Sequence, residues 1–308
     1  RRARPQVRSP LKRIDGGGDG AREGPASRFE ECSGEVWANG RWLDPLEATL
    51  PVGDPAVQFG LGVFETVAVR EGCALEREEH LARLRACASR VGVPLPDPGD
   101  LGAAVEKAAA GVPDGFGWLR VVASRSGRCF VFSGPMDPAE EGRAATAALL
   151  PWRRGTRDAL AGLKTLNYGA SVLGLEEAGR RGADEGLWLN ERGHLAEGCS
   201  SNLFVVRRRA VFTPGARDGI LPGIVRGLAI EAARGLALAV HEGKVRLPRL
   251  LSADEAFLTS STRGVRPLVA FEGKPVGRGI PGPVTRAIAR EVSRMRGVGR
   301  PGPDVVQR

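Results

Sequence analysis

A polar, irregular segment at residues 149–162, LLPWRRGTRDALAG, divides the chain into two stretches of similar character. On each side, short apolar runs bounded by turn residues alternate with stretches of helical periodicity. This pattern predicts an α+β protein with a small N-terminal domain over 33–150, a linker over 151–162 and a larger C-terminal domain over 163–293. A chain of 308 residues is long enough for two domains, each with its own core.

Two-residue turn signals and apolar residues at helical spacing predict the order of strands and helices within each domain. Strands are predicted on both sides of Asn39-Gly40, Glu71-Gly72 and Ser126-Gly127. Helices are predicted from about Glu78 and over 100–111, then over 168–182, 223–235 and 282–296.

Charge is concentrated at the two ends of the chain. Residues 1–30 hold eight Arg or Lys and four Asp or Glu in a Gly- and Pro-rich context, so residues 1–32 are predicted to be a disordered basic head. Residues 294–308 are predicted to be a basic tail. The net charge of +9 therefore does not describe one basic face, and with a single tyrosine and no basic-aromatic motif we expect no nucleic-acid partner.

Cysteine and histidine usage excludes several classes of protein. The five cysteines are scattered without a CxxC pair, and the three histidines, His80, His194 and His241, are far apart. We therefore expect neither a disulfide framework nor a metal site. No apolar run is long enough for a membrane span and no secretory signal is recognisable, so we expect a cytoplasmic protein without a membrane partner.

Lys164 stands out because the chain has five lysines against forty arginines. Arginine supplies positive charge but does not deprotonate in proteins, whereas lysine can become a nucleophile or a base. A lysine amine that condenses with an aldehyde suggests pyridoxal 5′-phosphate (PLP). The ordinary alternative is a solvated surface lysine.

PLP makes three further demands, and each has a candidate. An anion must face the pyridine nitrogen, and Glu197 in HLAEGCSSN ends a predicted strand. The phosphate needs amides, hydroxyls and a guanidinium, which GILPGIVRG (219–227), LTSST (258–262) and Arg83 can supply. Tyr168 can donate to the phenolic oxygen. Taken one by one, each also has an ordinary interpretation. Glu197 can belong to a turn, GILPGIVRG to a helix start and LTSST to a loop, while Arg83 can cover a helix surface and Tyr168 can be a core residue.

The joint order of these stretches resembles the class-IV (fold-type IV) PLP enzymes. This family includes branched-chain aminotransferases, D-amino-acid aminotransferases and aminodeoxychorismate lyases. The resemblance covers about residues 35–290 and is carried, in order, by QFGLGVFET, HLARL, KTLNY, GADEGLWLNERGHLAEGCSSNLFVV, TPGARDGILPGIVR and ADEAFLTSSTRGVRPL. It implies the fold-type IV architecture and PLP as the cofactor.

Transferred by position, the resemblance gives each candidate a role. Lys164 becomes the PLP lysine and Glu197 the partner of the pyridine nitrogen. The phosphate ligands implied are the Arg83 side chain, the Ile224 and Val225 amides and the Ser261 hydroxyl, and Tyr168 lies near the phenolic oxygen. The substrate residues implied are Phe64, Arg120, Arg125, Thr262 and Arg263. Family members are commonly dimers, so we expect a homodimer acting on a small amino substrate.

The reaction is less well determined than the cofactor. Many relatives have other residues at Pro55, Leu61, Gly264 and Arg266, all near the expected substrate entrance. Thr66, in FET, resembles the lyases and offers a hydroxyl that can assist elimination, whereas branched-chain aminotransferases commonly have glycine there. The resemblance favours aminodeoxychorismate lyase, with a branched-chain or related L-amino-acid aminotransferase as the alternative and a D-specific or amine transaminase as a third. A binding protein without activity is disfavoured by the retained lysine, glutamate and phosphate ligands.

Overall fold

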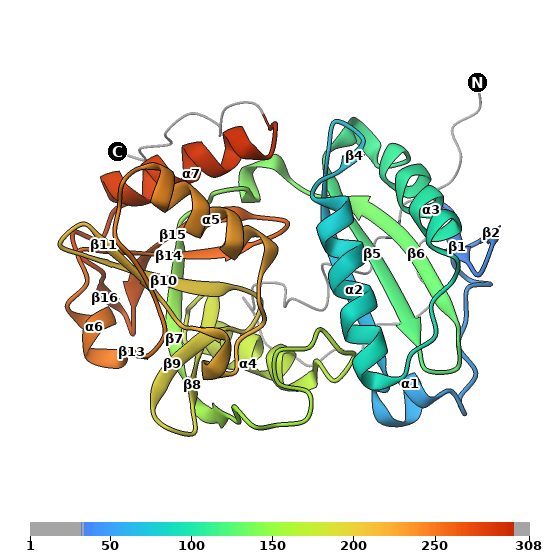
Figure 1. The fold of residues 1–308 in the computed structure, drawn as a ribbon, viewed down its shortest axis with the longest axis horizontal. Helices are drawn as coiled ribbons and strands as arrows, with labels where there is room; N and C mark the ends of the chain where they lie inside the picture. Colours follow the sequence, from blue (N-terminus) through green and yellow to red (C-terminus); the bar gives the residue numbers. More distant parts are fainter. Residues whose placement is uncertain (1–31, 33, 299–308) are drawn as a thin grey trace.

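A computed structural model describes residue 32 and residues 34–298 (Figure 1). The expected head over 1–32 lies almost entirely outside these residues, as does the tail beyond Val298. The first residues of the expected tail belong to the folded part of the protein. Arg294 and Met295 end the last helix, and Arg296 is only 8% exposed. Arg296 is ion-paired, which compensates a buried guanidinium.

The first half of the molecule, residues 34–142, is built on a six-stranded sheet of order β2-β1-β6-β5-β3-β4 in which all pairs are antiparallel. Its strands are β1 (Val36–Ala38), β2 (Arg41–Leu43), β3 (Gly62–Arg70), β4 (Cys73–Ala74), β5 (Gly117–Ser124) and β6 (Cys129–Pro135). The predicted turn at Asn39-Gly40 is confirmed, with φ of 44° and 91° at its two residues.

Two helices cover one face of this sheet. The helices of the first half are α1 (Pro55–Phe59), α2 (Arg77–Val91) and α3 (Pro98–Ala110), with a 3₁₀ turn η2 (Pro113–Gly115) and another, η3 (Pro138–Glu140), after β6. Apolar residues of α2 and α3, such as Leu84 and Leu101, pack against Val63, Val67 and Val121 of the sheet. In Figure 1, α2 lies on the side of this half that faces the second half.

The second half, residues 145–298, is built on a ten-stranded sheet of order β12-β11-β10-β14-β15-β7-β8-β9-β13, with β16 beside β15. Its strands are β7 (Ala145–Arg154), β8 (Glu185–Asn190), β9 (His194–Gly198), β10 (Asn202–Arg207), β11 (Ala210–Thr213), β12 (Val240–Glu242), β13 (Val245–Arg246), β14 (Glu255–Ser260), β15 (Gly264–Phe271) and β16 (Lys274–Pro275). Leu187, Leu203, Leu258 and Leu268, from four of these strands, share one buried cluster. The sheet therefore curls around that cluster.

Helices cover the outside of the curled sheet. They are α4 (Gly169–Arg180), α5 (Ile224–Gly235), α6 (Leu247–Leu251) and α7 (Pro283–Met295), with a 3₁₀ turn η4 (Ala216–Asp218). A second cluster joins Ala229 of α5 and Ile288 of α7 to Phe204 and Phe257, whose rings stack with centroids 4.6 Å apart. The α+β prediction is confirmed, and the expected helices occur.

The segment expected as a linker is partly strand. Residues through Arg154 belong to β7, which pairs in parallel with both β8 and β15 inside the second sheet. Its residues from Ala145 to Leu150 are buried or half-buried, and the strand continues into the largely exposed polar run PWRR. The remaining residues, 155–162, cross back to the first half.

Two further properties concern the described residues alone. In that part of the chain, none of the helices has both the length and the apolar character needed to cross a membrane. Within the same residues, no group of three or more His, Cys, Asp or Glu side chains could hold a metal ion.

Candidate active site

Lys164 directly follows the crossing residues 155–162, and the sequence places it in the C-terminal domain, but its backbone is paired with the first sheet. The Phe64 amide donates to the Lys164 carbonyl at 3.1 Å, and the Leu166 amide donates to the Gly62 carbonyl at 3.0 Å. Val63 and Thr165 form an antiparallel bridge. Lys164 is therefore held as an extra strand residue beside the start of β3, which limits the directions its side chain can take.

The Lys164 amine lies among aromatic and charged side chains. Its Nζ is 4.3 Å from the centre of the Phe64 ring and 5.9 Å from that of Tyr168. Burial of the amine lowers the pKa of Lys164 to about 8, although the negative charge of Glu65 opposes this shift. The amine can therefore gain and lose a proton near neutral pH, as a base or nucleophile must.

Glu197, at the end of β9, is a buried carboxylate with three donors. It forms an ion pair with Arg154 and accepts from the Asn202 Nδ2 at 3.1 Å and the Leu221 amide at 2.9 Å. Burial raises the pKa of Glu197 to about 7, against the lowering effect of Arg154 and the Leu221 amide. Such a carboxylate is stabilised by a cationic group placed beside it.

Tyr168, at the N-terminus of α4, joins Lys164 to the Glu197 region. Its hydroxyl donates to the Cys199 carbonyl at 2.6 Å, and its ring meets Phe64 edge-on with centroids 5.3 Å apart. Burial raises the pKa of Tyr168, so its hydroxyl stays protonated. Its predicted contact with a cofactor oxygen stays a prediction.

Arg83, on α2, reaches from the first half to the second. Its guanidinium binds both oxygens of Glu65, at 2.7 and 2.8 Å, and donates to the Pro222 carbonyl at 3.0 Å. His80 Nδ1 also lies 2.7 Å from Glu65. Burial opposes ionisation of Glu65, but the hydrogen bonds from Arg83 and His80 outweigh it and lower the pKa to about 2. A charged Glu65 therefore fixes Arg83 at this place.

The N-terminus of α5 begins two residues after Pro222. Gly223 is its N-cap residue and no side chain caps it, so the Ile224 and Val225 amides start the helix without acceptors inside it. A Cβ on Gly223 would come within 2.1 Å of the Asn202 Oδ1, so a larger residue there would force the Asn202 amide to move from its bonds to Glu197 and the Leu221 carbonyl. Arg83 and these amides are thus side by side, an arrangement suited to an anion.

The remaining predicted residues fall into three places. Ser261, Thr262 and Arg263 form the turn between β14 and β15, and Arg263 pairs with Glu140 at 3.1 Å. Thr66 and Arg120 face each other across β3 and β5, and the Arg120 guanidinium lies 4.3 Å over the Phe64 ring. Arg125 is exposed after β5, and its guanidinium lies beside Gly92, more than two helical turns from Arg83. The structure does not bring Arg125 to the other residues.

Four residues that contact the predicted site residues or one another in this site do not stand out in the sequence: Glu65, His80, Arg154 and Asn202. Glu65 and His80 lie in the quoted stretches FET and HLARL, whose strand and helix patterns place them where these elements meet. Asn202 directly follows CSS, at the start of β10. Arg154 carries no such signal, because it is one of forty arginines in a segment that reads as a linker.

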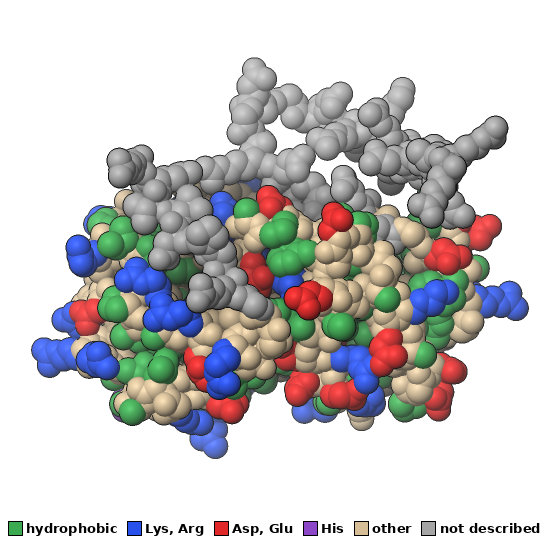
Figure 2. Space-filling view, turned by 90° about the horizontal axis from the view of Figure 1, so that it is seen from above, with side chains coloured by type: hydrophobic (Ala, Val, Ile, Leu, Met, Phe, Trp, Pro, Cys, Tyr) green, Lys and Arg blue, Asp and Glu red, His purple; other side chains and the backbone are tan. Residues whose placement is uncertain are grey.

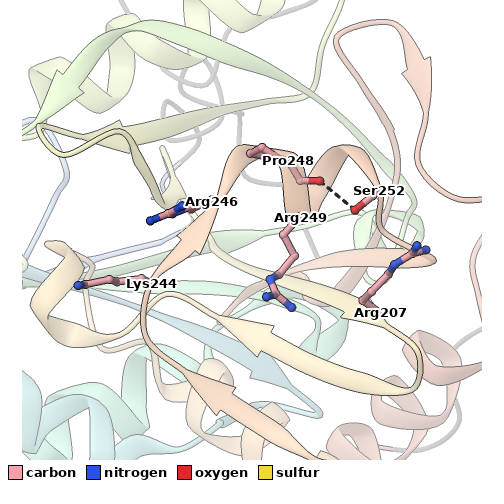
Figure 3. A pocket seen from close by; sticks show the side chains of 6 residues that line it. All are labelled: Arg207, Lys244, Arg246, Pro248, Arg249 and Ser252. Carbon is pink, nitrogen blue, oxygen red and sulfur yellow. Dashed lines mark hydrogen bonds between the residues drawn. The ribbon is translucent and has the colours of Figure 1, made fainter.

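A separate hollow of about 600 Å³ lies at the outer end of the second half, around α6 and β13 (Figure 3). It is lined by Arg207, Lys244, Arg246, Pro248, Arg249 and Ser252. Figure 2 shows Lys and Arg side chains projecting at this left-hand end of the molecule. Its lining contains none of the residues gathered around Lys164, so this hollow is not the site of the lysine chemistry.

The residues around Lys164 fit PLP. A buried amine of lowered pKa, a buried carboxylate and a guanidinium beside free helix amides match the aldehyde, pyridine nitrogen and phosphate of that cofactor. The sequence profile described as "Amino-transferase class IV" matches residues 62–271. The chain belongs to this family of PLP-dependent enzymes.

Known relatives include more than one activity. The chain is 28% identical over 280 residues to a putative branched-chain-amino-acid aminotransferase of Methanocaldococcus jannaschii, covering 85% of this chain and 96% of the relative. It is 29% identical over 255 residues to the aminodeoxychorismate lyase of Bacillus subtilis, covering 77% and 86%. The crystal structure of a branched-chain amino acid aminotransferase from Thermobaculum terrenum in its PLP form superposes with a TM-score of 0.77 at 27% identity, covering 87% and 95%.

We expect Arg83→Ala to weaken PLP binding by about ten- to a hundredfold. The change removes a charge-assisted contact worth about 1.5–3 kcal/mol and leaves Glu65 without its main partner. Titration of the apoenzyme with PLP measures the effect. Arg85→Ala, at an exposed position on the same helix, is the matched control. Equal affinities in the two variants would exclude Arg83 from the phosphate site.

Proposed function

We propose that this enzyme is an aminodeoxychorismate lyase, which converts 4-amino-4-deoxychorismate to 4-aminobenzoate and pyruvate. The observation that carries the proposal is an open patch on the face of the first sheet opposite α2 and α3. In the central strands β3, β5 and β6 through Gly134, the residues that are not buried are Thr66, Arg120, Val122 and Phe132. The register places all four on one face, in adjacent positions.

This patch suits a ring that carries carboxylates. Arg120 supplies a cation beside Phe64 and Phe132, and a guanidinium binds carboxylates well. Thr66 is paired directly across the strands from Arg120, so its side chain lies on the same face of the sheet. Thr66 and Arg120 give the patch polar groups beside the apolar Val122 and Phe132, whereas a pocket built for an aliphatic side chain alone would need no charged group there.

The residues around Lys164 have the properties that the first steps need. When bound, PLP supplies an aldehyde for amines and a ring that accepts electrons. The Lys164 amine takes the proton from the amine-bearing carbon of the substrate, and Glu197 holds negative charge for the ring nitrogen. Arg83, the α5 amides and Ser261 hold the phosphate. In the lyase, the Thr66 hydroxyl then assists loss of the enolpyruvyl group.

A branched-chain or related amino-acid aminotransferase is the second candidate. It is favoured by the similarity to the solved branched-chain aminotransferases and by the comparable identity to the archaeal relative. This reaction shares the same proton removal by Lys164 and then moves a proton to the cofactor instead of expelling a group. The two candidate functions therefore assign different roles to Thr66: it assists elimination in the lyase and only lines the substrate pocket in the aminotransferase.

We expect Thr66→Gly to reduce the release of pyruvate and 4-aminobenzoate, because it removes the hydroxyl that assists elimination. The space opened should let transamination of leucine or valine rise. Both reactions are assayed on each variant, from aminodeoxychorismate and from leucine or glutamate with a keto acid. Thr66→Ser keeps the hydroxyl and should retain elimination. Leucine transamination by the wild type without any release of pyruvate would reject the lyase and support the second candidate.

We also propose that the enzyme is a homodimer. Val52, Val57 and Phe59, in and beside α1, are 80%, 52% and 67% exposed and offer apolar area for a second copy. Sedimentation equilibrium should give a mass twice that of one chain. A monomer at micromolar concentration would reject this proposal.

A further inference from the structure

The turn between β14 and β15 is held from outside through all three of its carbonyl groups. The Ser261 carbonyl accepts from Arg296 Nη2 at 2.9 Å, and the Thr262 carbonyl from Arg70 Nη2 at 2.8 Å. The Arg263 carbonyl accepts from the Gly142 amide at 3.0 Å. A turn of this length normally leaves such groups to water, so this one is fixed by residues distant in sequence.

Arg70, the last residue of β3, brings the first half to the turn. Its side chain is 4% exposed and is held by the Val69 carbonyl at 2.8 Å and by Glu141 at 3.0 Å. Its guanidinium also lies 3.7 Å over the Phe116 ring. With these contacts Arg70 has little freedom, so its bond to Thr262 defines where the turn can lie.

Arg296, just beyond α7, connects the turn to α2. Its guanidinium binds both oxygens of Glu76, each at 2.9 Å, and its side chain is 1% exposed. Glu76 is the N-cap residue of α2, the helix that carries Arg83. The buried Arg296–Glu76 ion pair thus connects the turn that contains Ser261 to the helix that carries Arg83, and both residues are proposed phosphate ligands.

The direction of the carbonyls determines the direction of the amides. In a planar trans peptide the C=O and the next N–H point in opposite directions. With the Ser261 and Thr262 carbonyls held by the two arginines, the Thr262 and Arg263 amides point away from them. Loss of either arginine frees the turn to rotate and to change what it presents.

We infer that Arg70 and Arg296 are positioning residues that hold the Ser261–Arg263 turn in the conformation that binds the cofactor phosphate. They act through the turn carbonyls that they bind, and they couple the docking of the two halves to cofactor affinity. This inference rests on the proposed role of Ser261 in the phosphate site.

The test is a titration of apoenzyme with PLP and, separately, with pyridoxal, which lacks the phosphate. For Arg296→Gln we expect about a tenfold loss of PLP affinity and an unchanged affinity for pyridoxal. Arg70→Lys, which keeps the charge but not the planar fork, should show the same selective loss. Arg294→Gln is the matched control. Arg294 is a neighbouring exposed arginine, and its guanidinium binds both oxygens of Glu291 as that of Arg296 binds both oxygens of Glu76.

The outcomes separate the inference from the proposed phosphate site. Equal losses for PLP and pyridoxal would indicate general destabilisation and overturn the inference, as would an unchanged PLP affinity in both arginine variants. Ser261→Ala is measured in parallel. If that variant binds PLP as the wild type does, the phosphate role of Ser261 fails; if it weakens PLP binding while Arg296→Gln and Arg70→Lys do not, only the positioning role fails.

Discussion

Lys164→Ala is expected to abolish nearly all turnover and the visible absorbance of the lysine-bound cofactor. The amine serves both to hold PLP and to move the substrate proton, and loss of a positioned base alone costs about a hundred- to ten-thousandfold. Steady-state rates and absorbance spectra measure both effects. Lys274→Ala, at an exposed position in β16, is the matched control and should behave as the wild type.

Two observations would contradict this assignment. Reduction of the holoenzyme with borohydride should leave the pyridoxyl group on the peptide that contains Lys164, and its recovery on another lysine would reject the role. The amine must be neutral to react with PLP, and the pKa of Lys164 in the described structure is about 8. Recombination of apoenzyme with PLP should therefore accelerate as pH rises, with its midpoint near pH 8, and level off about one pH unit higher, below the midpoint expected for an ordinary lysine.

Glu197→Gln is expected to retain PLP but to slow turnover by about a hundredfold or more. A glutamine keeps the shape of the side chain but cannot hold the negative charge that stabilises a protonated ring nitrogen. Arg154, which is paired with the carboxylate in the wild type, would then face a neutral amide. Single-turnover measurement of proton removal from a deuterated substrate isolates the affected step.

The control for this variant is Glu191→Gln, at an exposed position in the turn between β8 and β9. It should leave the rate unchanged. Proton removal at a near-normal rate in Glu197→Gln would show that Glu197 does not act on the ring nitrogen. Loss of cofactor from that variant would instead assign it a binding role.

Local sequence patterns indicated most of the elements and the chemistry that we propose. The turn at Asn39-Gly40 follows from residues that accept positive φ, and the helix stripe around Leu81 and Leu84 follows from helical periodicity. Lys164 and Glu197 could be singled out because each lies in a short motif with a chemical reason. These properties depend on neighbouring residues, so the sequence contains them directly.

The boundary between the halves shows where local reasoning fails. Residues 151–154 look like a linker because they are polar, yet they continue β7 between β8 and β15. Strand pairing depends on partners far away in the chain, and polar residues at a strand end do not indicate whether those partners exist. The error also concealed Arg154, which belongs to the same stretch.

Which of the forty arginines form buried ion pairs depends on the tertiary structure. Arg83, Arg154 and Arg296 are paired with Glu65, Glu197 and Glu76, whereas Arg125 is exposed and apart from them. A guanidinium is stable in a buried place only where the fold brings a carboxylate and further acceptors to it, over separations of up to 220 residues here. The amino-acid sequence therefore indicated most of the elements, the family and the proposal that Lys164 binds PLP. Packing within each half decided the pairs Arg83–Glu65 and Arg154–Glu197, and docking of the two halves decided the pair Arg296–Glu76, because these pairs form only after strands and helices distant in the chain have packed together.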